Sequence, residues 1–184
     1  MAPFKLAIIV GSNRKASINR RLAQALAKLG SASFTPHFVQ IDDLPIYNQD
    51  LEAAAWPETA ARLKSEIEGA QAVLVVTPEH NRSIPAVLKN AIDWASRPSG
   101  KGVWRAKPVA IIGASPGSIG TACAQQHLRV VLGNLGAQVM GGEMFVTWKE
   151  GLVDDADAVS NEATRDFLQK FMDRFAVLVG KLAA

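Results

Sequence analysis

The sequence predicts an α/β fold in which a parallel sheet is covered by helices on both faces. Short apolar runs of the kind that form buried strands alternate with longer stretches in which apolar residues recur every three or four positions. Some runs, such as Ala72–Val76, are apolar throughout, which is typical of strands buried on both faces. Strands that alternate with helices form parallel sheets with right-handed crossovers.

The size and composition are those of one globular domain. The chain has 184 residues, of which 48% are hydrophobic and 20% are charged, so we expect a single domain spanning residues 1–184. The net charge of +3 is small and scattered, which gives no reason to expect a nucleic-acid partner.

Cysteine content and apolar runs bear on the compartment. Cys123 is the only cysteine, so no internal disulfide is possible. The N-terminal sequence lacks the pattern of a signal peptide, and no apolar run approaches the ~20 residues that cross a bilayer. We therefore expect a soluble, cytoplasmic protein without a membrane partner.

Five apolar runs are predicted as strands. The second contains Pro36, which favours an edge position because proline cannot donate to a neighbouring strand. The runs are Leu6–Val10, Phe34–Ile41, Ala72–Val76, Val109–Ile112 and Ala137–Met140.

Five helices are predicted between and after these strands. Ile18–Leu29 forms the first, Pro85 begins the third, and Ser160 caps the last. In the last helix an apolar residue recurs every fourth position, which we interpret as core packing rather than a cofactor motif. The periodic positions of the second, fourth and last helices are Ala60, Leu63 and Ile67; Leu128, Val131, Leu132 and Leu135; and Phe167, Phe171, Phe175 and Val179.

This order of elements matches the flavodoxin-like doubly wound sheet, with strand order 2-1-3-4-5. Ligands of such sheets bind outside the carboxyl ends of the strands, at the switch point between the first and third strands. The loops after the first, third and fourth strands are therefore the places to look for a site.

The first loop, Gly11–Asn19, has the chemistry of a phosphate cradle. It leads from a buried strand into a helix, whose first N–H groups and positive dipole end attract anions. Ser12, Ser17 and Asn19 are neutral hydrogen-bonding residues, and Arg14 is a forked cation suited to phosphate. The alternative is an ordinary loop with Ser17 as the helix N-cap. Arg14, Lys15, Arg20 and Arg21 make the surroundings basic, although part of this cluster can be a solvated helix face.

The other two loops suit a planar ring. Two prolines stiffen Thr77–Pro85, so its backbone groups can meet a heterocycle at fixed spacing; alternatively, Glu79 and Asn81 only pin the loop. His80 could act as an acid or base, although a lone exposed histidine seldom does.

The third loop, Gly113–Gly120, is made of small residues that allow a ring to approach the backbone. The first loop lacks the glycines of a dinucleotide site, so a mononucleotide is favoured.

Three motifs together resemble the NADPH-dependent FMN reductase family, which includes the bacterial chromate and quinone reductases. The resemblance runs from about Lys5 to Met140 and is faint from Gly141 onward. It implies a flavodoxin-like fold, one FMN per subunit, and ping-pong, two-electron reduction of quinones, flavins or similar small acceptors by NADPH or NADH. The motifs are Gly11-Ser12-x-Arg14-x-x-Ser17-x-Asn19, Thr77-Pro78-Glu79-x-Asn81-x-Ser83-x-Pro85 and Leu88-Lys89-Asn90-Ala91-Ile92-Asp93-Trp94.

The resemblance also implies which residues bind the cofactor. It leaves the physiological acceptor, and the choice between NADH and NADPH, open. It implies a homodimer or homotetramer, names no catalytic side chain, and gives no metal site. The phosphate would be bound by Ser12, Arg14, Ser17 and Asn19; the ring would be lined by Pro78, Glu79, His80 and Asn81, and bordered on its other side by Ser115, Pro116 and Gly117.

The chain also departs from the family pattern. His80 stands where the family usually has tyrosine, and Cys123 and Gln126 replace an arginine and a tyrosine of the quinone-reducing relatives. Trp94 and Trp104 suggest a partner surface, or else complete the core. Two alternative functions stay open: a flavodoxin-type electron carrier, which the sequence pI of about 9.2 disfavours because such carriers are usually acidic, and a flavin-free binding module.

Overall fold

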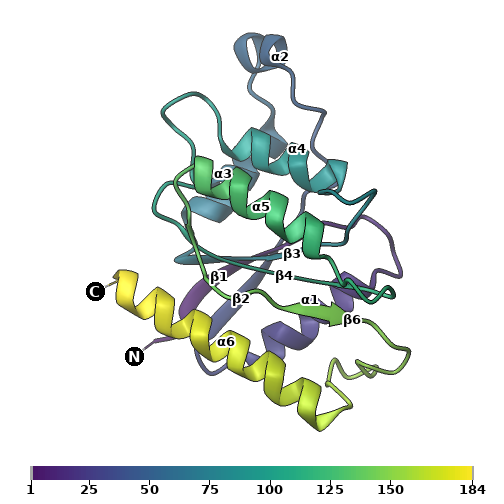
Figure 1. Ribbon diagram of the computed structural model, residues 1–184. Helices are drawn as coiled ribbons and strands as arrows, with labels where there is room; N and C mark the ends of the chain where they lie inside the picture. The colour runs from purple at the N-terminus through teal and green to yellow at the C-terminus, as the bar shows by residue number, and fades with distance from the viewer. Residues whose placement is uncertain (1, 184) are drawn as a thin grey trace.

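The computed structural model describes residues 2–183 and contains a parallel sheet of the predicted order (Figure 1). The sheet order is β2-β1-β3-β4-β5, and Pro36 lies on the edge strand β2, as expected. β1 pairs in parallel with β2 and with β3, and β3 pairs in parallel with β4. The strands are β1 Phe4–Val10, β2 Phe34–Val39, β3 Ala72–Val76, β4 Pro108–Ser115, β5 Gln138–Val139 and β6 Phe145–Thr147.

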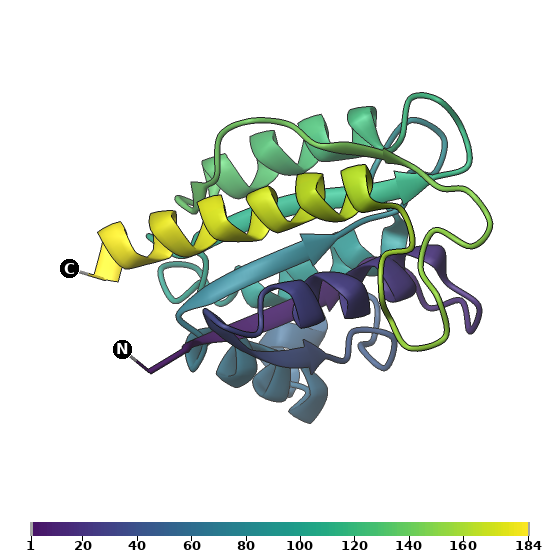
Figure 2. The same cartoon turned by 90° about the horizontal axis from the view of Figure 1, so that it is seen from below.

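Helices cover both faces of the sheet, because side chains on a strand point alternately to its two sides. Ile8 and Leu74 pack in one core with α1 and α6, whereas Ile9 and Val75 pack in the other with α3, α4 and α5. Figure 2 shows α1 and α6 on the near face. The helices are α1 Ile18–Leu29, α2 Gln49–Ala54, α3 Glu58–Glu68, α4 Ala86–Ala95, α5 Ala122–Asn134 and α6 Glu162–Ala183.

The strand prediction was incomplete at the far edge of the sheet, where the predicted fifth strand is present next to β4. The structure adds β6, which pairs in parallel with Gly113–Ser115 of β4, while β5 pairs only with the start of β4. This pairing extends β4 to Ser115, so Gly113, Ala114 and Ser115 are strand residues and not part of the third loop. The three residues of β6 are too few to give a periodic signal in the sequence.

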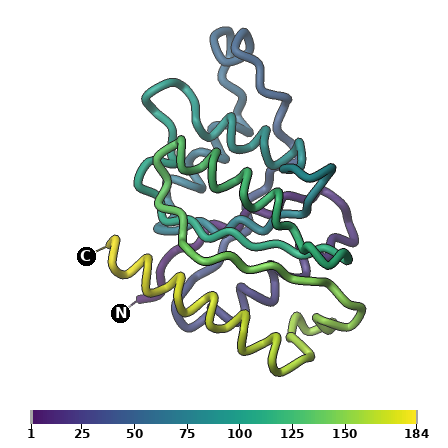
Figure 3. The backbone as a smooth tube through the Cα atoms, in the orientation of Figure 1, coloured from purple at the N-terminus to yellow at the C-terminus, as the bar shows by residue number. Residues whose placement is uncertain are grey.

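The segment 42–57 projects from the sheet and contains α2, which the sequence did not predict (Figure 3). Its base is anchored on α4. The Asn90 side chain accepts from Tyr47 N (2.7 Å) and donates to Pro45 O (3.0 Å), and Trp94 Nε1 also donates to Pro45 O (2.7 Å). Trp94 and Trp104 are buried, so they complete the core and do not form a partner surface.

The last helix departs from the prediction in two ways. Phe171, Phe175 and Val179 are buried as predicted, but Phe167 is 46% exposed. Four-residue steps on a helix with 3.6 residues per turn rotate a stripe gradually out of the core. Asn161 Oδ1, not Ser160, accepts from the backbone of the first turn, at 2.9 Å from Thr164 N. Ser160 instead donates to Gly151 O at 2.5 Å.

The loop before α6 folds back over α1. Arg21 donates to Val153 O, and Lys28 Nζ donates to Ala156 O at 3.0 Å. Asp154 Oδ1 accepts from the N–H groups of Ala158 (2.8 Å) and Ala156 (2.9 Å). The hydrogen bond from the Ala158 backbone, followed by that from Ala156, holds the pKa of Asp154 below its ordinary value. Arg21 therefore holds the loop before α6 in place and is not available as part of a basic patch at the first loop.

Within residues 2–183, no helix combines the length and the apolar character needed to cross a membrane. The same residues contain no cluster of three or more His, Cys, Asp or Glu arranged to hold a metal ion.

Candidate functional site

The first and second predicted loops meet at the carboxyl edge of the sheet. Gly11 N donates to Val76 O at 2.9 Å, and Thr77 N donates to Ile112 O at 2.9 Å. A Cβ atom on Gly11 would lie 2.9 Å from Leu88 Cδ2 and 3.3 Å from Pro78. Any larger residue here would crowd Leu88 and Pro78, so glycine favours the close packing of the first loop against the second.

The first loop ends at a capped helix N-terminus. Ser17 is buried and its Oγ accepts from Arg20 N at 3.2 Å, so the N-cap interpretation of this residue is confirmed. Ser12 is half-buried, with its Oγ 3.4 Å from Arg14 N. Arg14 and Lys15 are exposed, and neither has an ion-pair partner among residues 2–183. The positive end of α1 and two free cations thus face the same solvent-accessible loop.

Asn19 ties the first loop to the end of β4. Its Nδ2 donates to Ala114 O, and its Oδ1 accepts from Ala114 N, both at 2.9 Å. Asn19 is only 2% exposed and Ala114 only 1% exposed. The amide therefore satisfies two buried backbone groups, and one Nδ2 hydrogen remains for any phosphate contact. The sequence singled out Asn19 but gave no sign of its partner.

The second loop contains a tight turn at His80–Ser83. His80 N donates to Ser83 O (3.1 Å), and Ser83 N donates to His80 O (2.9 Å). The two central residues, Asn81 and Arg82, have left-handed backbones, with φ of 49° and 64°. Such conformations disfavour residues other than glycine, although asparagine tolerates them best. His80, Asn81 and Arg82 are exposed, so the turn presents its edge to solvent.

Glu79 pins the second loop, in agreement with the alternative role considered from the sequence. Its Oε2 accepts from Cys123 N (2.9 Å) and Ala124 N (3.1 Å) in the first turn of α5. Thr121 makes no side-chain cap there, so a carboxylate from another loop satisfies the helix N-terminus instead. Arg82 Nη1 lies 3.6 Å from Glu79 Oε1.

The third loop is shorter than predicted from the sequence, and much of it is exposed. Ser115 is the last residue of β4, its carbonyl accepts from Trp148 N at 2.8 Å, and its Oγ accepts from Gly117 N at 3.0 Å. Pro116 and Gly117 are exposed. A Cβ on Gly113 would lie 2.0 Å from Thr77 O, which leaves no room for a side chain between β4 and the start of the second loop.

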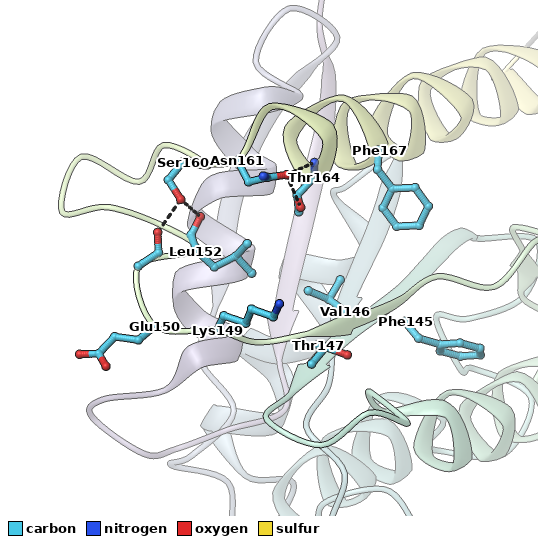
Figure 4. Close-up of a pocket in the computed structure, with 11 residues that line it drawn as sticks. Phe145, Val146, Thr147, Lys149, Glu150, Leu152, Ser160, Asn161, Thr164 and Phe167 are labelled. Carbon is cyan, nitrogen blue, oxygen red and sulfur yellow. Dashed lines mark hydrogen bonds between the residues drawn. The ribbon is translucent and has the colours of Figure 1, made fainter.

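A separate hollow of about 440 Å³ lies between β6 and the start of α6 (Figure 4). Phe145 and Phe167 flank it, and Lys149 and Glu150 lie along the loop that closes it. None of the predicted site residues lines this hollow. It was not predicted, because it depends on β6 and on the fold-back of the following loop.

A comparison with known protein families shows which family the chain belongs to. The model for NADPH-dependent FMN reductase matches residues 4–150. The chain belongs to this family. A 2-hydroxy-1,4-benzoquinone reductase from Burkholderia sp. is 49% identical over 177 residues, which cover 96% of each chain. A quinone reductase from Pseudomonas putida is 46% identical over 174 residues, covering 94% of this chain and 93% of the relative.

A solved structure of a similar protein has nearly the same shape. The flavoenzyme NAD(P)H:(acceptor) oxidoreductase from Paracoccus denitrificans superposes with a TM-score of 0.93 at 45% identity, covering 97% of this chain and 98% of that one. The similarity to these relatives extends past Met140, where the motifs in the sequence become faint. The flavodoxin-like fold predicted from the sequence is therefore confirmed.

The departures from the family pattern cluster beside the second loop. Cys123 is half-buried, and its backbone N–H is bound by Glu79. Gln126 is exposed on the following turn of α5, and His80 is exposed on the turn. The three residues at which the sequence analysis expects a departure from the family pattern therefore lie on one turn and one helix.

Proposed function

We propose that the chain is a single-domain, FMN-dependent NAD(P)H oxidoreductase that reduces quinones. The observation that carries this proposal is the meeting of the three loops at one edge of the sheet. The cations of the first loop have no ion-pair partner among the described residues, and the turn of the second loop is exposed. The names and the near-complete coverage of the relatives support the same conclusion.

The residues present fit FMN. A terminal phosphate needs a cation and neutral donors at a helix N-terminus, and Arg14, Ser12 and the start of α1 supply them together. A planar ring needs access to backbone groups, and the exposed turn at His80–Ser83 and the exposed Pro116 and Gly117 supply that access.

FMN, when bound, supplies the two-electron hydride chemistry, so the protein's share is binding, orientation and electrostatics. Arg14 and Ser12 hold the phosphate, while Ser17 and Asn19 keep the loop in shape. Pro78, Glu79, His80 and Asn81 form one side of the ring site, and Ser115, Pro116 and Gly117 form the other. The prolines have no N–H group, and those of His80 and Gly117 already donate to Ser83 O and Ser115 Oγ. The backbone N–H groups of Glu79 and Asn81 are therefore the donors that the second loop offers to negative charge on the ring.

The proposal also covers the substrates, the compartment and the oligomeric state of the enzyme. The partners are NADH or NADPH and a small-molecule acceptor, and the protein acts in the cytoplasm as a homodimer or homotetramer. Light scattering at micromolar concentration tests the assembly, since a monomer mass would contradict it.

A titration with FMN tests the cofactor site. Arg14→Ala should weaken FMN binding at least tenfold, because a charge-assisted contact to phosphate is worth about 1.5–3 kcal/mol, while the apoprotein stays folded. Arg105→Ala is the matched control, because Arg105 is an exposed arginine next to β4 at the opposite edge of the sheet. Equal affinity in the two variants would remove the first loop from the cofactor site.

Turnover distinguishes an enzyme from an electron carrier. Purified protein with FMN should oxidise NADH or NADPH steadily when a benzoquinone is added, with no second protein. Flavin binding without such turnover would support a carrier, and a colourless protein that takes up no FMN would support a flavin-free module.

A further inference from the structure

The turn at His80–Ser83 is fastened to α5 at both of its ends. Before the turn, Glu79 binds the N–H groups of Cys123 and Ala124. At the last residue of the turn, Ser83 Oγ lies 2.9 Å from His127 Nδ1. The proposed function gives the first contact a place beside the ring site, but it leaves His127 without a role.

The spacing along α5 explains how one helix holds both ends. Residues three and four positions apart lie on the same face of a helix, and His127 follows Ala124 and Cys123 by three and four positions. The N–H groups of the first turn, which have no partner within the helix, point out of the N-terminal end of α5, and the His127 side chain, one turn later, contacts the same loop. His127 itself is exposed, so the contact does not serve to fill the core.

Contacts at the ends of the turn matter because only two backbone hydrogen bonds close it, and its two central residues are strained. Asn81 and Arg82 both have left-handed backbones, each disfavoured by about 1–2 kcal/mol, and the side chains around them are exposed. Without contacts at its ends, a turn of this kind relaxes to other conformations.

We propose that His127 is a positioning residue for the flavin site, which it serves by holding Ser83 and thereby fixing the turn at His80–Ser83. This rests on the proposed function. α5 begins directly after the loop that contains Pro116 and Gly117. A turn fastened to α5 therefore stays at a fixed separation from that loop, and this separation is the width available to the ring.

Variants of His127 and Ser83 test the atom that makes the contact. His127→Ala and Ser83→Ala should each weaken FMN binding by about 3- to 10-fold, the effect of losing one hydrogen bond, and should alter the visible circular dichroism of the flavin. His127→Asn should restore both, because its amide lies where Nδ1 does, whereas His127→Gln places its amide near Nε2 and should not. His37→Asn, at an exposed histidine on β2, should change neither.

Two further measurements separate positioning from plain stability. The double variant Ser83→Ala/His127→Ala should be no worse than either single variant, since one contact is lost in all three. Amide hydrogen exchange of residues 79–84 in the apoprotein should accelerate in His127→Ala and recover in His127→Asn.

Several results would overturn the proposal. These are additive effects of the two alanine variants, equal rescue by asparagine and glutamine, or a lower unfolding midpoint with an unchanged flavin spectrum and affinity. If the unsubstituted protein binds no FMN, the proposed function fails instead, and the exchange measurement still decides whether His127 holds the turn.

Discussion

Replacing Asn19 by alanine should destabilise the protein far more than an average asparagine substitution. The change removes two hydrogen bonds of 2.9 Å and leaves the N–H and C=O of Ala114 buried without partners. Each unsatisfied buried group costs about 1–3 kcal/mol, so the free energy of unfolding should fall by about 2–6 kcal/mol. This is a large share of the ~5–15 kcal/mol that stabilises a typical domain.

Urea unfolding of the apoprotein measures this loss without any contribution from a cofactor. With a slope of about 2 kcal/mol per molar urea, the midpoint should fall by roughly 1–3 M. Asn134→Ala is the control, because Asn134 is exposed at the end of α5 and its loss should cost less than about 0.5 kcal/mol. Equal midpoints for the two variants would show that the contact with Ala114 does not contribute to stability in solution, and the reasoning would fail.

Three further predictions concern the core, the acid stability and the projecting segment. Phe171→Ala should cost about 3–5 kcal/mol in urea unfolding because Phe171 is 1% exposed, whereas Phe167→Ala should cost less than about 1 kcal/mol; similar values would contradict the assignment of Phe167 to the surface. Asp154→Asn should lower stability at neutral pH and match the unsubstituted protein in strong acid. The reason is that a carboxyl whose pKa is lowered in the folded state stabilises fully above its unfolded pKa and loses that contribution as pH falls through its folded pKa. A difference in unfolding midpoint that stays constant down to pH 2 would count against this prediction. Asn90→Ala should make the segment 42–57 more sensitive to limited proteolysis, because two anchoring hydrogen bonds are lost, and cleavage at the unsubstituted rate would refute the anchor.

The sequence predicted the central sheet well because its signal is local. Continuous apolar runs such as Ala72–Val76 are buried on both faces, and the alternation with amphipathic stretches is enough to fix a parallel sheet with a defined order. The prediction failed where the sequence segment is short, where it buries no side chains, or where burial depends on a small difference in angle around a helix. β6 has three residues, α2 buries none of its side chains, and Phe167 differs from Phe171 only in its angle around the same helix.

The candidate site divides in the same way. The phosphate-binding chemistry of Arg14 and Ser12 and the capping role of Ser17 could be predicted, because they depend on residues adjacent in sequence. The partners of Asn19, Glu79 and Ser83 could not, since they lie from 44 to 95 positions away along the chain.

By itself, then, the sequence determined the class of the fold, the three loops at the sheet edge and the type of anion that the first of them suits. Only the tertiary structure decided which polar side chains remain free for a ligand and which are occupied in holding the loops together. The reason is physical: a buried polar group must find a partner wherever the fold brings one close, and hydrogen-bonding capacity at one position does not specify that partner. Asn19 holds Ala114 and Glu79 holds α5, while the Arg14 side chain has no ion-pair partner within residues 2–183.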